Sequence, residues 1–195
     1  MLDNVRADID RYRFMNRDKR LWVFDLIISM EFMGLWATLD YRARRWIKMK
    51  VRVPGIRQLL RLLTFFSKFA VQTTTGIILP SDADIGKGLY IGHWGCVVVN
   101  GGSVMGENCN LSQDVTLGIA GRGDERGAPV VGNRVYIAPG VRIIGRVTVG
   151  DDVAIGANAV VTKDIPDRAV AVGIPAKVIS YDGSADFVEY RHISS

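Results

Sequence analysis

The feature that most constrains the fold of this chain is a six-residue repeat of aliphatic residues in its C-terminal part. One unbroken series consists of Val131, Ile137, Ile143, Val149, Ile155 and Val161, and a second lies four positions further on, at Val135, Val141, Val147, Val153 and Ala159. A helix repeats its apolar face about every 3.6 residues and a strand every two, so neither alone explains a fixed period of six. We therefore expect each hexapeptide to form a short strand and a corner, three hexapeptides to close a triangular coil, and the aliphatic side chains to fill the axis of a stack of coils.

Small residues follow most members of the first series, and the same spacing extends upstream. Gly132, Ala138, Gly150 and Gly156 occupy the positions after the aliphatic residue. We expect them to lie at tight corners, where glycine allows a positive φ. Ile85 and Ile91 begin an upstream series, which slips by two residues and resumes at Val99, Met105, Leu111 and Leu117.

Two interruptions of the repeat mark candidate functional regions. The slip falls at GHWGC (92–96), which adds two residues to a corner beside His93. The larger break is GIAGRGDERGAPV (118–130), a charged, glycine-rich segment that we expect to project from the stack as a loop. Loops held on a rigid scaffold are where binding and catalytic residues concentrate.

Residues 1–75 have a different character, with only two of the 21 glycines of the chain. We predict two or three helices there, separated by a turn at Pro54–Gly55. The segment 56–69 places Ile56, Leu59, Leu60, Leu63, Phe66 and Phe69 along one stripe of a helix. The predicted organisation is a helical segment (1–75), a repeat domain (76–180) and a mobile C-terminal tail (181–195) without repeats, which contains the surface residue His192.

Positive charge is concentrated in the helical segment. Residues 1–75 carry 15 Lys and Arg against 7 Asp and Glu, whereas residues 76–195 carry 10 against 13. The stretch YRARRWIKMKVR (41–52) combines basic and aromatic residues, which suits contact with a membrane surface or, alternatively, the solvated face of a helix whose other side packs. No recognition motif accompanies this charge, so we do not expect binding to nucleic acid.

The apolar run at residues 21–39 is long enough to cross a bilayer, but it contains Asp25 and Glu31. Charged residues are unfavourable in hydrocarbon, so we expect a buried or membrane-facing amphipathic helix. The charged N-terminus does not resemble a signal peptide. Cys96 and Cys109 show no metal-site or disulfide spacing and are expected to be buried free thiols, which suits the cytoplasm.

Several motifs resemble the hexapeptide-repeat acyltransferases, and within them the serine acetyltransferases. The matches are GIILPSDADIGKG, GHWGCVVV, DVTLG, GRGDERGAPVV and the repeat from GVRIIG to IPAKVI, which together cover residues 76–180. The resemblance implies a mainly β chain, a left-handed parallel β-helix preceded by a helical N-terminal segment. It also implies a homotrimer and acetyl-CoA as the acetyl donor, with no metal.

By this resemblance, His93 corresponds to the family's catalytic histidine, a general base that takes the proton of the acceptor hydroxyl. An imidazole suits that role because its ordinary pKa lies near neutrality. Trp94 is a candidate for stacking on a sugar ring or for simple corner packing. Further candidates for acceptor contacts are Asn100, Gln113, Arg122, Asp124 and Arg126.

The resemblance also places the donor. The segment GANAVVTKDIP matches the family's acetyl-CoA-binding stretch, in a groove between adjacent subunits. It assigns backbone and phosphate contacts to Ala157, Thr162 and Lys163, and a phosphate contact to Lys177. Ala138 and Gly156 would leave room for the pantetheine arm.

The acceptor side departs from the serine acetyltransferase pattern. Ile78 stands where that family has the aspartate that supports the histidine, and Gly92 replaces an acidic residue. Gly127 and Ala128 replace an Arg-His pair before Pro129. We therefore expect a sugar hydroxyl of a surface polysaccharide as acceptor, acetylated at the inner membrane face.

Two alternatives stay open from the sequence. The first is serine O-acetylation at a rearranged site, and the second is a non-catalytic trimeric scaffold. In any catalytic interpretation the loss of the supporting aspartate at Ile78 requires another group to orient His93: a backbone carbonyl, Asp82, Asp84 or Asp114, from the same or a neighbouring chain.

Overall fold

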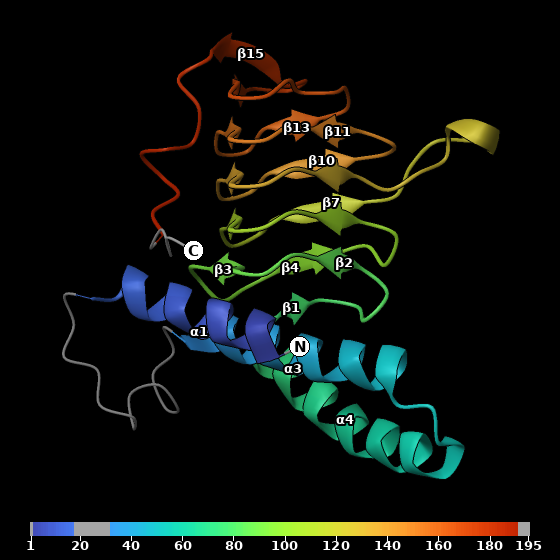
Figure 1. Cartoon of the computed structure of the whole chain (residues 1–195). Helices are drawn as coiled ribbons and strands as arrows, with labels where there is room; N and C mark the ends of the chain where they lie inside the picture. The colour runs from blue at the N-terminus through green and yellow to red at the C-terminus, as the bar shows by residue number, and fades with distance from the viewer. Residues whose placement is uncertain (1, 18–31, 191–195) are drawn as a thin grey trace.

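The computed structural model describes residues 2–17 and 32–190. Three helices, α1 (Leu2–Met15), α3 (Met33–Lys50) and α4 (Pro54–Thr75), lie at one end of a stack of coils (Figure 1). The strands are β1 (Ile77–Ile78), β2 (Asp84–Ile85), β3 (Tyr90–Ile91), β4 (Val97–Val99), β5 (Val104–Met105), β6 (Asn110–Leu111), β7 (Thr116–Gly118), β8 (Val130–Val131), β9 (Tyr136–Ile137), β10 (Arg142–Ile144), β11 (Thr148–Val149), β12 (Ala154–Ile155), β13 (Val160–Val161), β14 (Val170–Val172) and β15 (Lys177–Ser180). A 3₁₀ turn, η2 (Gly123–Glu125), lies between β7 and β8.

The strands form the three faces of a parallel β-helix. Their orders are β1-β4-β7-β10-β13, β2-β5-β8-β11 and β3-β6-β9-β12-β14, with β15 added antiparallel at the end of the third face. Ile143 pairs with Val161, 18 residues further on, which is one coil of three hexapeptides. Ile91 pairs with Leu111 across the two-residue slip. The left-handed β-helix preceded by helices, as predicted, is confirmed.

The aliphatic series fill the axis of the stack. No member of either series is more than 4% exposed. The upstream series is equally buried, at Ile85, Ile91, Val99, Met105, Leu111 and Leu117. Each coil buries its aliphatic side chains against those of the coils above and below, so the hydrophobic effect stabilises the stack as a unit.

The glycines after the aliphatic residues are required for a different reason from the one predicted. A Cβ on Gly132 would lie 2.7 Å from the backbone carbonyl carbon of Gly150, and a Cβ on Gly150 would lie 2.6 Å from the amide nitrogen of Asp167. Neither glycine has a positive φ, so the close approach of coils excludes a side chain there. Within residues 2–17 and 32–190, the non-glycine residues that do adopt positive φ are Asn108, Asp114, Arg134, Asp152, Asn158 and Arg168.

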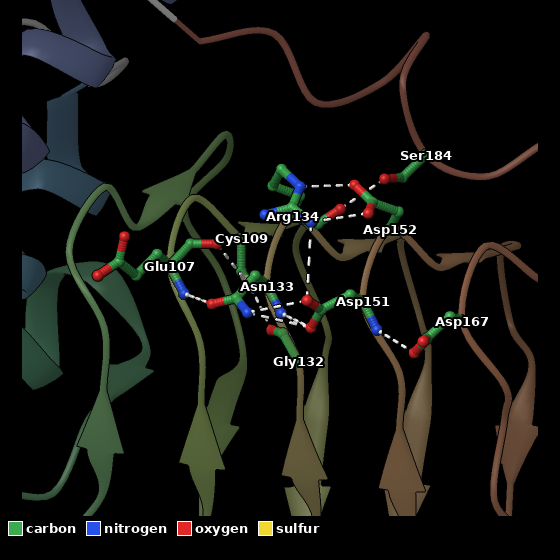
Figure 2. A network of polar contacts seen from close by, with 9 residues as sticks. All are labelled: Glu107, Cys109, Gly132, Asn133, Arg134, Asp151, Asp152, Asp167 and Ser184. Carbon is green, nitrogen blue, oxygen red and sulfur yellow. Dashed lines mark hydrogen bonds and ion pairs between the residues drawn. The ribbon is translucent and has the colours of Figure 1, made fainter. Parts of the chain in front are cut away.

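One edge of the stack is joined by a ladder of polar side chains (Figure 2). The Oδ1 atom of Asn133 accepts a hydrogen bond from the Glu107 amide at 2.9 Å, and the Asn133 amide donates to Asp151 at 2.7 Å. The Asp151 amide in turn donates to Asp167 at 2.8 Å. Hydrogen bonds from Asn133 hold the pKa of Asp151 below its ordinary value. Each corner therefore satisfies a backbone donor of the neighbouring coil.

The helices cap the first coil, whose outer backbone groups lack a further coil to pair with. The Tyr41 hydroxyl donates to the carbonyl of Ala83 at 2.8 Å and accepts from the amide of Ile85 at 3.2 Å. The Tyr12 hydroxyl does the same at Ile91, at 3.1 and 2.9 Å. Two helical tyrosines thus supply the partners that would otherwise be missing.

A buried ion pair completes this junction. The Asp8 carboxylate accepts from the Gly88 and Leu89 amides at 2.8 and 3.0 Å and pairs with Arg42 at 2.8 Å. Both side chains are at most 3% exposed. Part of the basic stretch 41–52 is therefore buried, which accords with a helix that packs on one side.

The helix boundaries refine two predictions. The helix α3 ends at Lys50 and α4 begins at Pro54, so the chain turns between these two residues. Proline is tolerated as the first residue of a helix. Part of the run 21–39 and part of the tail 181–195 lie outside the described residues. Asp25, Glu31 and His192 belong to these undescribed parts. None of the helices in the described ranges is long and apolar enough to cross a bilayer.

Candidate active site

The most prominent feature around His93 is a cavity of about 580 Å³ on the third face of the stack. The end of α1, the corner between β3 and β4 and the C-terminal segment surround it. Its lining consists of Met15, Asn16, Tyr90, Gly92, His93, Trp94, Asn110, Leu111, Ser112, Tyr136, Asp186, Phe187 and Glu189.

The corner that carries His93 is held between two buried strands. Ile91 and Val97 are both completely buried, so the five residues between them must turn outward. The amide of Gly95 donates to the Thr75 carbonyl at 2.8 Å, and Gly95 has a φ of +114°, where other residues would be strained. His93 and Trp94 are exposed, and the extra corner residues present them to the cavity.

This corner also explains an error about the cysteines. Both are free, but only Cys109 is buried, whereas Cys96 is exposed because it belongs to the turn rather than to the axis of the stack. Burial raises the pKa of the Cys109 thiol to about 12. Cys109 therefore remains protonated near neutral pH.

Residues 181–190, here called the C-terminal strap, are the described part of the predicted tail and close one side of the cavity. The ring of Phe187 stacks on Tyr136 with centroids 4.7 Å apart. Asn110 donates from Nδ2 to the Phe187 carbonyl at 2.8 Å, and the Ser184 hydroxyl donates to the Arg134 carbonyl. These contacts bring the strap's acidic side chains to the His93 cavity.

The carboxylates in the cavity lining have basic side chains close by, outside the lining. Asp186 and Glu189 enter from the strap, and Glu189 pairs with Arg17 at 2.9 Å. Behind the wall, the buried Arg11 donates from Nη2 to Asn110 at 2.6 Å. Burial lowers the pKa of Arg11 to about 10, which leaves its guanidinium charged at neutral pH.

The other predicted acceptor residues lie outside the lining of this cavity. Gln113 is on the neighbouring coil beside Gly95, and among the described residues its buried Oε1 atom has no hydrogen-bond partner. Asn100 instead accepts from the Gly102 amide at 2.9 Å.

Arg122, Asp124 and Arg126 lie on an arm, residues 118–130, closed by hydrogen bonds between Ala120 and Gly127. The arm projects from the stack on the side away from the strap (Figure 1). Within one chain, only Trp94 of the predicted acceptor residues shares the cavity with His93.

The three aspartates considered for orienting His93 are engaged elsewhere. Asp82 pairs with Lys48, and Asp84 pairs with Arg45 at 2.5 Å. Asp114 pairs with Arg142 at 2.9 Å, and none of the three aspartates lines the His93 cavity.

The residues predicted to bind the donor lie in the last coils of the stack. Ala138 is buried and Gly156 half-buried, at equivalent positions on adjacent coils, since Ile137 pairs with Ile155. A Cβ on Gly156 would lie 2.7 Å from Cγ1 of Val172, so packing alone already requires a small residue there. The remaining four, Ala157, Thr162, Lys163 and Lys177, are exposed.

Sequence reasoning missed most of the cavity wall. Tyr90, Asn110 and Tyr136 are paired in register on successive coils, each just before a buried aliphatic residue. The repeat could have identified this row. The strap and the end of α1 contain no sequence repeat, so their contribution to the cavity could not be predicted from periodicity. In the described parts of the chain, no group of three or more His, Cys, Asp or Glu residues is arranged to hold a metal ion.

Comparison with known proteins identifies the family. The model for the bacterial transferase hexapeptide (six repeats) matches residues 128–163. The serine acetyltransferase of Helicobacter pylori is 36% identical over 155 residues, which cover 80% of this chain and 86% of that enzyme. A solved serine acetyltransferase in complex with CoA has a TM-score of 0.72 at 28% identity, with 91% of this chain and 68% of that one covered.

These relatives overturn the predicted sugar acceptor, because their similarity extends over most of the chain under the name serine acetyltransferase. The departures at Ile78, Gly92, Gly127 and Ala128 do not outweigh it. The chain spans 62% of the length of another relative, the Synechococcus elongatus serine acetyltransferase, to which it is 32% identical over 81% of its own length. The chain belongs to the serine acetyltransferase family of hexapeptide-repeat transferases.

Proposed function

We propose that this protein transfers an acetyl group from acetyl-CoA to the hydroxyl of serine. The observation that carries the proposal is the match to the Helicobacter pylori serine acetyltransferase over 86% of that enzyme's length. The similarity to a serine acetyltransferase solved with CoA supports acetyl-CoA as the donor. The cavity beside the exposed His93 supports the proposal, because an acceptor could bind there next to the imidazole.

His93 acts as the general base. A serine hydroxyl is too weak an acid to ionise unaided at neutral pH, so a base must take its proton as the oxygen attacks. The oxygen attacks the thioester carbonyl, the carbon–sulfur bond breaks, and CoA leaves as a thiolate. The imidazolium of His93 then returns the proton to that sulfur.

The strap supplies a contact for the acceptor. Serine carries an ammonium group, and Asp186 lies in the His93 cavity with its carboxylate on a segment anchored by Phe187. An opposite charge at this place favours an amino acid over a neutral sugar. Asp186 would thus compensate for the acidic residue that Gly92 replaces in the family pattern.

The carboxylate of serine requires a cation, and the arm provides candidates. Arg122 and Arg126 lie on the arm, outside the cavity of their own chain. We infer that three copies assemble so that the arm of one copy reaches the His93 cavity of the next. Apolar side chains on the outer surface of the stack, such as Val98 and Val130, are 38% and 43% exposed and could be covered in this assembly.

We infer that the donor binds beside the last coils, between adjacent subunits. Lys163 and Lys177 are exposed there and suit the phosphates of CoA, since lysine is a compact point charge. Thr162 and the backbone at Ala157 contact the same molecule, and the pantetheine arm passes Ala138 and Gly156.

The test is an acceptor assay with purified protein. Release of free CoA from acetyl-CoA is followed with L-serine, with D-serine and with neutral sugars, and the product is identified by mass spectrometry. We expect O-acetylserine and CoA in equal amounts with L-serine only. Sugar-dependent CoA release without a response to serine would contradict the proposed acceptor, and no release with any acceptor would contradict the proposed activity.

A matched pair of variants tests the strap. Asp186→Asn is expected to raise the KM for serine with little change in the KM for acetyl-CoA. Asp182→Asn, on the same strap but outside the cavity lining, is the control. Equal effects of both variants would contradict the ammonium contact.

A further inference from the structure

The feature that the proposed function does not explain is the apolar surface of α4. Seven large apolar side chains of this helix are more than half exposed, although the helix packs against α3. We call this group the α4 apolar face: Ile56 (54%), Leu59 (58%), Leu62 (57%), Leu63 (57%), Phe65 (60%), Phe66 (63%) and Phe69 (65%). A contiguous apolar surface of this kind marks an interaction site.

Only a narrow stripe of α4 packs against the rest of the chain. Leu60, Thr64 and Val71 are half-buried and recur at helical spacing; Thr64 borders the space between α3 and α4, and Val71 packs against the apolar core of the stack. Figure 1 shows α4 along the lower edge of the molecule, at the opposite end from β15. The α4 apolar face occupies the remaining side of the helix, with Phe65 at its border with α3.

The surroundings of this face are strongly basic. Residues 41–75 contain nine Lys and Arg and no Asp or Glu. Four of the nine form ion pairs with aspartates outside this segment. The other five, which take part in none of these ion pairs, are Lys50, Arg52, Arg57, Arg61 and Lys68. A cavity of about 320 Å³ between α3 and α4 is lined by Arg44, Lys48, Arg61 and Lys68, and it includes Phe65 from the α4 apolar face. The basic side chains therefore border the apolar side chains directly.

We propose that the α4 apolar face docks on the surface of a bilayer containing anionic lipids. The helix would lie in the plane of the interface, with its phenylalanines and leucines among the acyl chains and the basic cavity at the level of the phosphates. A helix with Leu and Phe on one face and Lys and Arg on the other has the composition of interfacial helices. This inference does not depend on which acceptor the enzyme uses.

The charge distribution favours lipid over a second copy of the chain. Two α4 faces packed together would bring the same five basic residues of two copies close to one another, with no Asp or Glu in either segment 41–75. An anionic bilayer instead attracts each of these charges.

The experiment is vesicle co-sedimentation of the full-length protein. Vesicles of phosphatidylcholine alone are compared with vesicles that also contain phosphatidylserine. We expect the protein to sediment with the anionic vesicles and to be released as salt is raised, because salt screens the charges. The double variant Leu63→Glu/Phe66→Glu should bind at least about tenfold more weakly, because two large apolar side chains no longer enter the lipid.

The control variant is Ile179→Glu, since Ile179 is 64% exposed on β15 at the far end of the stack. It should bind vesicles as the wild type does. The proposal is overturned if wild-type protein ignores anionic vesicles, or if both variants bind equally. It is also overturned if Leu63→Glu/Phe66→Glu reduces the mass of the assembly while the wild type does not bind vesicles, because the face would then lie between copies.

Discussion

The coil stack and α4 carry equally regular apolar patterns, yet one pattern is buried and the other is exposed. Ile143 in the stack is completely buried, whereas Leu63 in α4 is 57% exposed. In the stack, each coil supplies the apolar partner of the next, so the pattern is satisfied within the chain. In α4 a single neighbouring helix covers one stripe, and the remaining pattern indicates a partner outside the chain. Periodicity therefore identifies the residues that need an apolar partner but not where that partner lies.

Truncation of one side chain in each region should separate them most clearly. Ile143→Ala should lower the free energy of unfolding by about 2–5 kcal/mol, because it leaves a cavity on the axis of the stack. Leu63→Ala should change it by less than about 0.5 kcal/mol, since the side chain is mostly in water. Urea unfolding of both variants checks this. An equally large effect of Leu63→Ala would show that α4 is covered in solution.

The polar caps between helices and stack should give the next largest effect. Tyr12→Phe removes a buried hydroxyl that bonds both the carbonyl and the amide of Ile91, and it should cost about 1–3 kcal/mol of unfolding free energy. Tyr181→Phe is the matched control, because Tyr181 is 59% exposed. If the two variants melt at the same temperature, the helices do not cap the first coil in the way described.

Glycine variants test the close approach of the coils. Gly132→Ala places a Cβ within 2.7 Å of the next coil's backbone and should destabilise the protein by about 1–3 kcal/mol. Gly55→Ala, at the start of α4, meets no atom within 4 Å and should be neutral or stabilising by up to about 1 kcal/mol. Thermal unfolding distinguishes these outcomes, and a neutral Gly132→Ala would contradict the packing argument.

The smallest effect is expected from acid titration of the corner ladder. The folded-state pKa of Asp151 lies below its ordinary value because Asn133 donates hydrogen bonds to the carboxylate. Its contribution to stability is therefore present above the ordinary aspartate pKa, about 3.9, and is lost as the pH falls through the folded-state pKa. Asp151→Asn should flatten the acid limb of the stability curve slightly. An unchanged limb would mean that Asp151 does not contribute.

Most of the fold was predictable from the sequence because every hexapeptide obeys the same burial requirement. Val131 and Ile155 both face the axis because each is the aliphatic residue that its hexapeptide must bury. Deletion of one residue from a hexapeptide would turn the aliphatic side chains that follow it away from the axis. The corner at His93 was also predictable, since two additional residues have no room inside the stack. The role of the glycines was not, because Gly132 is constrained by Asp151 and Gly150 on another coil rather than by its own φ.

The candidate site was less predictable because it is built from segments without a period. Asp186 and Phe187 reach the cavity only through contacts with Asn110 and Tyr136, which lie on other coils. The acceptor was predicted wrongly because the absence of family residues such as the Arg-His pair was taken to exclude serine. Charges that bind a small zwitterion can come from elsewhere in the fold, as proposed for Asp186.

The central claim is that acetyl transfer to serine takes place at His93, and a four-way rate measurement tests it most directly. CoA release is measured for wild type and for His93→Ala, each with and without L-serine, after equal thermal stability has been verified. We expect rapid release only for wild type with serine, and a loss of about 10²–10⁴-fold in kcat for His93→Ala. Serine-dependent release by His93→Ala at the wild-type rate would contradict it.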